Sequence, residues 1–581
     1  MRRAASLLVE IRPMSTNEAP STPELAPHPR WRGLVLPAAV ALATAAAAIL
    51  SHRAITWAPL NVDEEMTRFV AGHSFSSILD IVSNKRGGGP LHFWLVHVTL
   101  STFHGLIGLR GPSLAFFVLA LPAAALVARE LADEWAAVGA VILLATSPLG
   151  MSYASFGRPH TMLLAWLLWS TVLALRAVRL GGRVRFGIAG AALGTSIFVH
   201  PTAPLYALSA GLAAVIVSPL PWRTLLRDGW VGVVTCFVGF VPYEIKTAHV
   251  LGERYGISAG AQHGRTFTRL PVWHDALATI APGRHAFLNV FTIGAALGML
   301  SLLGKRRRSA VAMGIIIAAP VAFFTWVPAN GLAAIFFDRY MLPALPAFLT
   351  LVAAGVAALT AHLGRLRPLV FALVISGVAY VGIHIVTVRQ GQLHDLRLPA
   401  VASAIAEDAT HSVVFSAAGS TQIGAYPGQF SYGRPADLIG RYVQLSHPEI
   451  TLVDDESCQP VVSWLTLQPE AAHGVWVFYA VRDDELARAQ TALAQFPEVT
   501  VTVPAHRYFL LRSKDQLAPR ALLALGITLR QAWLKAVPMN PRAQLLIDAD
   551  TTALHDPNAC VATGPLGDPG ISPNYPLTND S

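Results

Sequence analysis

Long apolar runs are the feature that most constrains how this chain can fold. Between residues 34 and 388 they recur with short polar segments between them, and each is close to the roughly 20 residues that a helix needs to cross a bilayer. Only 13% of the residues are charged, against roughly 25% in soluble globular proteins. The sequence therefore predicts a mainly α protein, built as a polytopic transmembrane helix bundle.

The candidate crossings can be placed on the sequence. They are residues 34–52, 90–107, 111–128, 135–152, 159–177, 186–200, 203–219, 229–246, 286–303, 309–327, 338–361 and 368–388. Basic residues lie between them, at Arg30, Arg32, Arg176, Arg179, Arg183, Arg185, Arg223, Arg227, Lys305 to Arg308, Arg365 and Arg367. All fall on one side if each run from residue 135 onward crosses once, and the positive-inside rule makes that side cytoplasmic.

This sidedness creates a parity problem near the N-terminus. The segment 53–89 must lie outside and the loop 129–134 inside, so the runs 90–107 and 111–128 do not both cross. The other run is then a re-entrant or interfacial helix, and the total is about eleven crossings. The outer segments 53–89 and 247–285 are long enough to carry helices of their own, and Ser74 to Val82 has helical spacing.

Four regions follow from these patterns. Residues 1–33 form a cytoplasmic N-terminal segment and residues 34–388 the membrane module. Residues 389–515 are predicted to form a small extracytoplasmic α/β domain, and residues 516–581 a helix with a disordered tail. The expected strands are 412–420, 450–455, 475–481 and 499–511, with a helix at 484–496.

Composition also limits the cofactors and partners. The net charge of +9 follows from the basic loops, so membrane lipids are expected as partners and nucleic acid is not. Cys236 is expected to be a small core residue, while Cys458 and Cys560 could pair if their region is extracytoplasmic. The spacing fits no zinc or redox site, so no cofactor is predicted; a divalent metal is compatible with the sequence but not indicated.

An acidic segment follows the first predicted crossing. Asp63 and Glu64 stand just outside the membrane, where a carboxylate could take the proton of an acceptor hydroxyl in glycosyl transfer. The alternative is a solvated helix N-terminus, where acidic residues are favoured by the helix dipole. Spacing alone favours this alternative.

Cationic and aromatic residues are expected on the same face of the membrane. Lys85, Arg86, Arg158 and Arg339 are candidates for binding a phosphate, and the possible substrate-binding residues are His92, His160, His200, Asp338 and Tyr340. The alternatives are lipid-headgroup contacts for the cations, mutual neutralisation of Asp338 and Arg339, and a structural role for His200. The convergence of acids and bases at one face is stronger support than any single motif.

The order of these motifs resembles the GT-C superfamily of glycosyltransferases. An acidic pair, Gly-Pro-Leu-His-Phe-Trp at residues 89–94, Gly-Arg-Pro-His at 157–160 and Asp-Arg-Tyr-Met-Leu-Pro at 338–343 are similar to motifs of the bacterial protein-O-mannosyltransferase-like and aminoarabinose-transferase-like branch. The resemblance covers about residues 34–390. Two departures stand out: Gly88-Gly89 replaces the family's usual His-Pro, and Gly157 replaces its usual Ala.

The resemblance implies an enzyme with a polyprenyl-phosphate sugar donor, inverting transfer and no nucleotide. Asp63 becomes the favoured base with Glu64 as its neighbour, and Lys85, Arg158 and Arg339 become donor-phosphate ligands. The acceptor would be a hydroxyl of a cell-envelope glycan, lipid or protein, at a bacterial inner or plasma membrane. The sequence leaves open whether the sugar is a hexose or a pentose. Two alternatives remain: a lipid-linked sugar transporter or flippase, and a non-catalytic membrane assembly protein.

Overall fold

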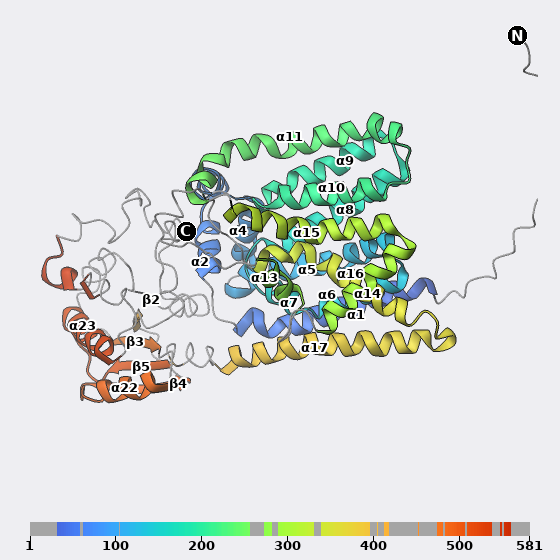
Figure 1. Cartoon of the computed structure of the whole chain (residues 1–581). Coiled ribbons are helices and arrows are strands. Elements are labelled where there is room, and N and C mark those ends of the chain that lie inside the picture. The colour runs from blue at the N-terminus through green and yellow to red at the C-terminus, as the bar shows by residue number, and fades with distance from the viewer. Residues whose placement is uncertain are drawn as a thin grey trace, which may run out of the picture.

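The chain forms a helix bundle with a smaller sheet-containing unit beyond one of its ends (Figure 1). This computed structural model describes residues 32–57, 62–86, 88–103, 105–255, 272–281, 289–329, 338–395, 404, 412–416, 451–452, 473–479, 483–505, 508–536, 547–548 and 551–558. The predicted N-terminal segment up to residue 31, the pairing of Cys458 with Cys560 and the disorder after residue 558 lie outside these ranges.

The bundle consists of α-helices joined by short helical turns. In chain order these are α1 (Arg32–Trp57), α2 (Val62–Ala71), α3 (Phe75–Ile81), the π-helical turn η1 (Val82–Arg86), α4 (Leu91–Phe103), α5 (Gly105–Leu131), α6 (Glu134–Ala145), α7 (Pro148–Ala154), α8 (His160–Leu180), α9 (Arg183–Gly194), η2 (Thr195–Phe198), α10 (Ala203–Val217), α11 (Trp222–Tyr255), α13 (Val272–Ile280), α14 (Val290–Lys305), α15 (Arg307–Ala329), η3 (Asp338–Ala344), α16 (Leu345–Leu359), η4 (Gly364–Leu366) and α17 (Arg367–Asp395).

The bundle confirms the predicted fold class, although fewer helices have full spanning length than expected. Within the described ranges, seven helices are long and apolar enough to cross a membrane, or eight if α6 and α7, bent by 55°, form one span. About eleven were predicted. Four of the predicted runs form helices of only 12 to 16 residues, namely α4, α9, α10 and α14. At 1.5 Å per residue these are about 18 to 24 Å long, shorter than the hydrocarbon core.

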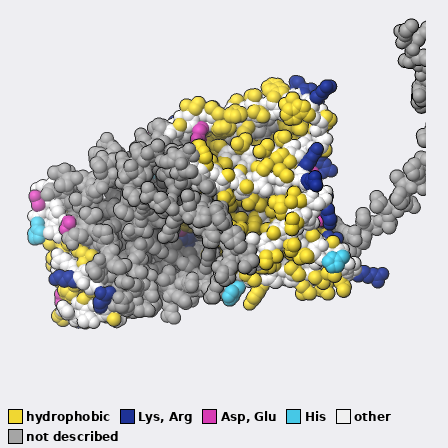
Figure 2. Space-filling view, in the orientation of Figure 1, with side chains coloured by type: hydrophobic (Ala, Val, Ile, Leu, Met, Phe, Trp, Pro, Cys, Tyr) yellow, Lys and Arg dark blue, Asp and Glu magenta, His cyan; other side chains and the backbone are white. Residues whose placement is uncertain are grey.

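The basic loops gather at one end of the bundle, as predicted. Figure 2 shows Lys and Arg side chains concentrated at the end where α1 begins, beside a broad hydrophobic surface. Contacts between loops join four of these segments: Arg179 with Glu130 (3.3 Å), Arg306 with the Glu130 carbonyl (3.5 Å), Arg183 with Asp228 (4.0 Å) and Arg308 with the Ser218 carbonyl (2.9 Å). Loops 129–134, 176–185, 218–228 and 305–308 therefore share one side.

The position of Glu130 resolves the parity problem. Helix α5 runs from Gly105 to Leu131, so about 20 residues, or about 30 Å, separate Arg110 near its start from Glu130 at the basic end. This rise matches the hydrocarbon thickness of a bilayer. Helix α4 has only 13 residues, or about 20 Å. Of the two predicted runs, α5 is therefore the one with spanning length.

Helix α11 lies at the edge of the bundle and packs tightly against α9. A Cβ added at Gly190 would lie 2.0 Å from the Gly232 carbonyl oxygen, and one at Gly194 would lie 2.3 Å from that of Cys236. Small residues allow such close backbone approach between membrane helices. Most other side chains of α11, including Trp230 and Phe237, are exposed on the bundle surface, as expected for a helix that borders lipid.

The C-terminal unit contains a five-stranded mixed sheet, in the order β2-β1-β3-β5-β4. Its elements are β1 (Ser412–Ser416), β2 (Thr451–Leu452), β3 (His473–Tyr479), α22 (Asp483–Leu493), β4 (Val499–Ala505), β5 (Tyr508–Ser513) and α23 (Pro519–Ala536). Strand β1 is parallel to β2 and β3, whereas β5 is antiparallel to β3 and β4. The α/β character is as predicted, but the single strand expected at 499–511 is a hairpin of two strands.

Helix α23 belongs to the same core as the sheet. Trp476 and Phe509 from the sheet pack with Leu522 and Trp533 of α23, and Ala553 joins them. The helix expected after residue 515 is thus present. Because it shares the sheet's core, the packing continues across the boundary predicted between residues 515 and 516.

Candidate functional site

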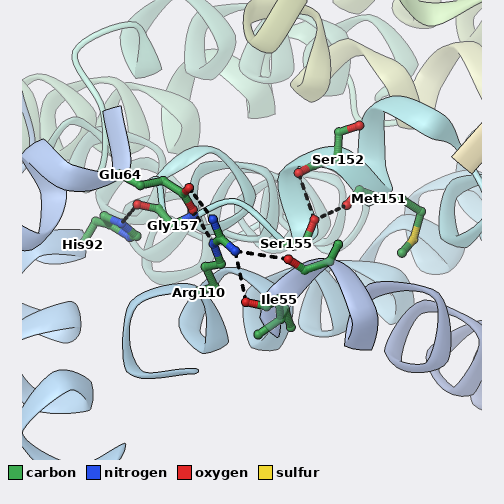
Figure 3. A network of polar contacts seen from close by, with 9 residues as sticks. Ile55, Glu64, His92, Arg110, Met151, Ser152, Ser155 and Gly157 are labelled. Atoms are coloured by element: carbon green, nitrogen blue, oxygen red, sulfur yellow. Dashed lines mark hydrogen bonds and ion pairs between the residues drawn. The ribbon is translucent and has the colours of Figure 1, made fainter. Parts of the chain in front are cut away.

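The acidic residues predicted as catalytic lie on the short helix α2, at the end of the bundle that faces the C-terminal unit (Figure 1). The Glu64 side chain is almost fully buried. Its two carboxylate oxygens accept hydrogen bonds from Nε and Nη2 of Arg110, each at 2.7 Å, as Figure 3 shows. This bidentate geometry is the strongest form of an Arg–carboxylate pair. Asp63 precedes Glu64 on α2, and its side chain is outside the description.

Arg110 also holds the end of α1. Its Nη1 donates to the carbonyl oxygens of Ala54 (3.1 Å) and Ile55 (3.0 Å), in the last turn of a helix that ends at Trp57. Carbonyls in that turn have no partner within the helix, and a basic side chain can satisfy them. Arg110 was not among the residues predicted from the sequence. It could have been predicted as a site residue because it is a lone arginine between two apolar runs, and an ionisable residue at membrane depth is usually paired or functional.

The turn that contains Arg158 is fixed from three helices. Gly157 N–H donates to Glu64 Oε1 at 2.7 Å, and Nε2 of His92 on α4 donates to the Gly157 carbonyl at 3.4 Å. Ser113 of α5 donates to the Arg158 carbonyl at 3.2 Å. The guanidinium of Arg158, which is buried, donates from Nη1 to Oγ1 of Thr67 on α2 at 3.3 Å.

The departure at Gly157 has a packing explanation. A Cβ at this position would lie 2.9 Å from Cγ of Leu109 and 3.3 Å from Oε1 of Glu64. The first distance is shorter than real Cβ contacts allow, so an alanine would push the turn away from the Glu64 carboxylate. Glycine at position 157 therefore fits the short hydrogen bond between its own N–H and Glu64.

His160, His200 and the η3 turn, which contains Arg339, lie close to Arg158. The ring of His160, at the start of α8, lies 5.3 Å from that of His200 and 5.1 Å from that of Tyr153, between ring centroids. His200 lies 6.3 Å from Tyr340 of η3. Arg158 precedes His160 by two residues, and Arg339 lies beside Tyr340. We call Arg158, His160, His200 and Arg339 the cationic cluster.

His160 is buried, and its Nε2 atom has no hydrogen-bond partner within the described ranges. A buried polar nitrogen without a partner costs free energy unless a ligand or water completes it. His200 is held differently, because Thr202 N–H donates to its Nδ1 at 3.2 Å. That contact leaves the proton of a neutral His200 ring on Nε2, which makes Nε2 a donor.

The η3 turn is anchored by aromatic and hydrogen-bond contacts. The Tyr340 ring stacks on Phe324 of α15 with centroids 4.7 Å apart and planes 7° apart. The Tyr206 hydroxyl donates to the Tyr340 carbonyl at 2.5 Å. The Arg339 guanidinium lies 5.7 Å from the centre of the Tyr340 ring, within cation–π range. Arg339 is therefore presented from a turn that α10 and α15 hold in place.

An apolar crevice opens beside this turn. It is lined by residues of α5, α8, α10, α15 and η3–α16, among them Leu164, Tyr206, Ile316, Pro343 and Ala347. Tyr206 and Pro343 connect it to η3, because Tyr206 bonds to Tyr340 and Pro343 is part of that turn. The crevice is thus small, lies within the membrane part of the bundle and borders the η3 turn.

The remaining predicted residues are placed only by their backbones. Lys85 and Arg86 belong to η1, and Asp338 begins η3; the side chains of all three are outside the description. Six of the predicted residues have described side chains and lie close together: His92, Arg158, His160, His200, Arg339 and Tyr340. Within the described ranges, no group of three His, Cys, Asp or Glu residues could hold a metal ion.

Comparison with known proteins gives both a sequence match and a shared fold. Residues 87–245 match the family described as dolichyl-phosphate-mannose-protein mannosyltransferase. No curated protein matches the chain in sequence. ArnT from Cupriavidus metallidurans in the apo state superposes over 81% of this chain and 97% of that one, with a TM-score of 0.51 and 16% identity.

Two further solved structures are similar at lower scores. ArnT from the same organism bound to undecaprenyl phosphate covers 82% of this chain and 98% of that one, with a TM-score of 0.49 and 16% identity. The oligosaccharyltransferase AglB from Archaeoglobus fulgidus, in complex with an inhibitory peptide and a dolichol-phosphate, covers 77% and 70%, with a TM-score of 0.41 and 12% identity.

The family match begins just after η1 and ends within α11, and it includes the His92 and Arg158 segments. The ArnT-like fold extends over most of the chain. The chain is thus a multi-pass membrane protein with the fold of ArnT, and part of its membrane module matches a mannosyltransferase family.

Proposed function

We propose that the protein is an inverting glycosyltransferase that moves a sugar from a polyprenyl-phosphate donor to a hydroxyl acceptor on the extracytoplasmic face of the membrane. The observation that carries this proposal is the cationic cluster, in which Arg158 donates to Thr67 of α2, at the end of the bundle away from the start of α1 (Figure 1). The buried His160 Nε2 of this cluster has no partner within the described ranges, and a ligand that completes its hydrogen bond is favourable. A lipid-linked phosphate arriving along the membrane would be such a ligand.

The small apolar crevice beside Tyr206 and Pro343 marks one surface along which the lipid part of such a donor would pack. It continues from η3 into the membrane part of the bundle and is lined mainly by aliphatic side chains. An isoprenoid tail would lie along its mouth, with its phosphate at Arg158 and Arg339. Guanidinium groups bind phosphate oxygens through paired hydrogen bonds, and the leaving phosphate gains charge as the glycosidic bond breaks. The cluster would therefore bind the phosphate more tightly in the transition state.

Asp63 is the proposed general base. The acceptor oxygen attacks the anomeric carbon while the bond from that carbon to the phosphate oxygen breaks, and Asp63 takes the acceptor proton. A single displacement of this kind inverts the anomeric centre. Glu64 has a different role in this scheme, because Arg110 and Gly157 already occupy its oxygens. It positions α2, and with it Asp63, against the Arg158 turn.

The proposed sidedness follows from the positive-inside rule. Arg and Lys gather where α1 begins, so that end is assigned to the cytoplasm, and the site with the C-terminal unit to the opposite face. The C-terminal unit lies beyond the site end of the bundle (Figure 1). It is suitably placed to contact a glycan, lipid or protein acceptor at a bacterial plasma or inner membrane.

Purified protein in detergent, supplied with undecaprenyl-phosphate donors that carry a radiolabelled hexose or pentose, tests this proposal. Transfer of label to a cell-envelope extract, with release of undecaprenyl phosphate, is expected for at least one donor. Release of labelled donor into the opposite leaflet of proteoliposomes without transfer would instead indicate a flippase. Neither transfer nor translocation, in a protein that still associates with membrane partners, would indicate a non-catalytic assembly role.

A further inference from the structure

One buried tyrosine of helix α11 contacts the turn at Gly88–Gly89, which follows the basic residues Lys85 and Arg86 and is called the basic turn. The Tyr243 side chain is buried, although few of the described side chains of α11 are. Its hydroxyl donates to the Gly88 carbonyl at 2.6 Å, and its ring lies 5.0 Å from that of Phe198 at the end of η2. Tyr243 therefore touches both the turn that follows Lys85 and Arg86 and the segment that leads to His200.

Gly88 and Gly89 are shaped to fit between these two contacts. Gly88 has a φ of 154°, a conformation that residues with a Cβ rarely adopt. A Cβ on Gly89 would lie 2.1 Å from the Phe198 carbonyl oxygen and 2.5 Å from the Val199 carbonyl carbon. The glycine pair thus lets the turn pack directly on the backbone next to His200.

The Gly88–Gly89 turn packs directly on the Phe198–Val199 backbone, with no side chain between them. The Tyr243 hydroxyl of α11 donates to the Gly88 carbonyl of this turn. Catalytic and binding groups need to be held within about half an ångström by such supporting contacts. The bond from Tyr243 is the polar part of this support, and it comes from a helix without any predicted site residue.

We infer that Tyr243 is a positioning residue that holds the Gly88–Gly89 turn against the Phe198–His200 segment, and so fixes His200 for the donor phosphate. This inference rests on the proposed function. Loss of the tyrosine hydroxyl removes the polar part of this support and leaves the ring contact with Phe198 in place. The predicted consequence is weaker phosphate binding in a protein of unchanged fold.

The test is binding of sugar-free undecaprenyl phosphate to the purified full-length protein in detergent. Tyr243→Phe is expected to weaken the affinity about fivefold, on the order of one lost hydrogen bond, with the melting temperature unchanged. Its KM for the donor should rise while its KM for the acceptor stays the same. Tyr380→Phe is the matched control, because Tyr380 is exposed on α17, and it should bind like wild type.

The outcomes separate the inference from the proposed function. Wild-type protein that fails to bind undecaprenyl phosphate would contradict the proposed function. Binding by wild type and equal binding by Tyr243→Phe would overturn only the positioning role. If Tyr243→Phe lowers the melting temperature, Phe198→Leu decides instead, since it loosens the ring contact but keeps the hydroxyl. Weaker binding at wild-type stability then supports the inference, and unchanged binding rejects it.

A second pair of variants tests the glycine packing. Gly89→Ala would place its Cβ against the Phe198 carbonyl, and we expect most of the protein to be lost from the membrane fraction or to bind undecaprenyl phosphate at least tenfold more weakly. Gly377→Ala is the control, because a Cβ there meets nothing within 4 Å. If Gly89→Ala kept wild-type yield and affinity, the turn would not be packed in this way.

Discussion

The two charged groups at the site end of the bundle differ in how their hydrogen bonds are completed. In the Glu64–Arg110 network, both carboxylate oxygens and the guanidinium are matched by protein partners at 2.7 to 3.1 Å. In the cationic cluster, by contrast, the buried His160 Nε2 has no partner in the described part of the chain.

This contrast separates a completed ion pair from an incomplete polar site. An internally completed ion pair holds elements together, and removal of one partner leaves a buried charge. A buried imidazole nitrogen without a described partner is unfavourable alone and becomes favourable when a ligand completes its hydrogen bond. Residue type did not reveal the difference, because each group contains an arginine that is buried in an otherwise apolar bundle.

The largest expected effect concerns the two acidic neighbours on α2. Asp63→Asn should reduce sugar transfer by a factor of about 10² to 10⁴, the usual contribution of a general base, while undecaprenyl phosphate binding and the melting temperature stay unchanged. Glu64→Gln should instead lower the melting temperature, because it weakens the pair with Arg110. Transfer assays and thermal unfolding on both variants check this. Full activity in Asp63→Asn would reject Asp63 as the base.

Removal of Arg110 should break the completed network. Arg110→Met is expected to destabilise the folded protein by about 3 to 5 kcal/mol, because Glu64 is left buried and unpaired. The double variant Glu64→Gln with Arg110→Met should recover part of this loss. Denaturation midpoints in detergent measure both. A single variant as stable as wild type would mean that the pair does not hold α1, α2 and α5 together.

Substitution of His160 should weaken phosphate binding more than stability, whereas substitution of Arg110 should mainly lower stability. His160→Ala is expected to weaken undecaprenyl phosphate binding about tenfold, a loss of about 1.4 kcal/mol, with no loss of stability, since the imidazole nitrogen lacks a described protein partner. Binding titrations at low ionic strength check this, with His384→Ala on α17 as control. A large fall in melting temperature with unchanged binding would show that His160 is structural.

The smallest effect is expected at the anchor of η3. Tyr206→Phe removes the bond to the Tyr340 carbonyl, which is worth about 1 kcal/mol. The Phe324 stacking still holds the turn, so we expect only a few-fold rise in the KM for the donor. Steady-state kinetics against donor concentration measure it. No change in KM would indicate that aromatic packing alone positions Arg339.

Much of the fold could be predicted from the sequence. Apolar runs and basic loops predicted the bundle, the gathering of the basic loops at one end and the need for one non-crossing run. The length of α5 and the contacts of Glu130 identify α5 as the spanning helix of the two. The lengths of α4, α9, α10 and α14 were not predictable, because helix ends in apolar sequence depend on packing. The hairpin in 499–511 was missed because both strands share one apolar pattern.

The site was predicted by residue type more than by role. Arg158, His160, His200, Arg339 and Tyr340 come together as expected, since motifs at the ends of successive crossings share one face. Arg110 and Tyr243 were missed, because each lies within or beside an apolar run and its partner is a residue distant in sequence or a backbone carbonyl. The resemblance favoured Asp63 over Glu64 as the base, and the contacts that hold Glu64, from Arg110 and Gly157, could not be predicted because both partners are distant in sequence.

The central claim is that the cationic cluster binds the phosphate of a lipid-linked sugar. An experimental structure with undecaprenyl phosphate tests it most directly. We predict density for the phosphate within hydrogen-bond distance of His160 Nε2 and the guanidinium groups of Arg158 and Arg339, with the isoprenoid along the crevice beside Tyr206. A phosphate bound elsewhere, with the cluster closed by protein contacts alone, would contradict this account.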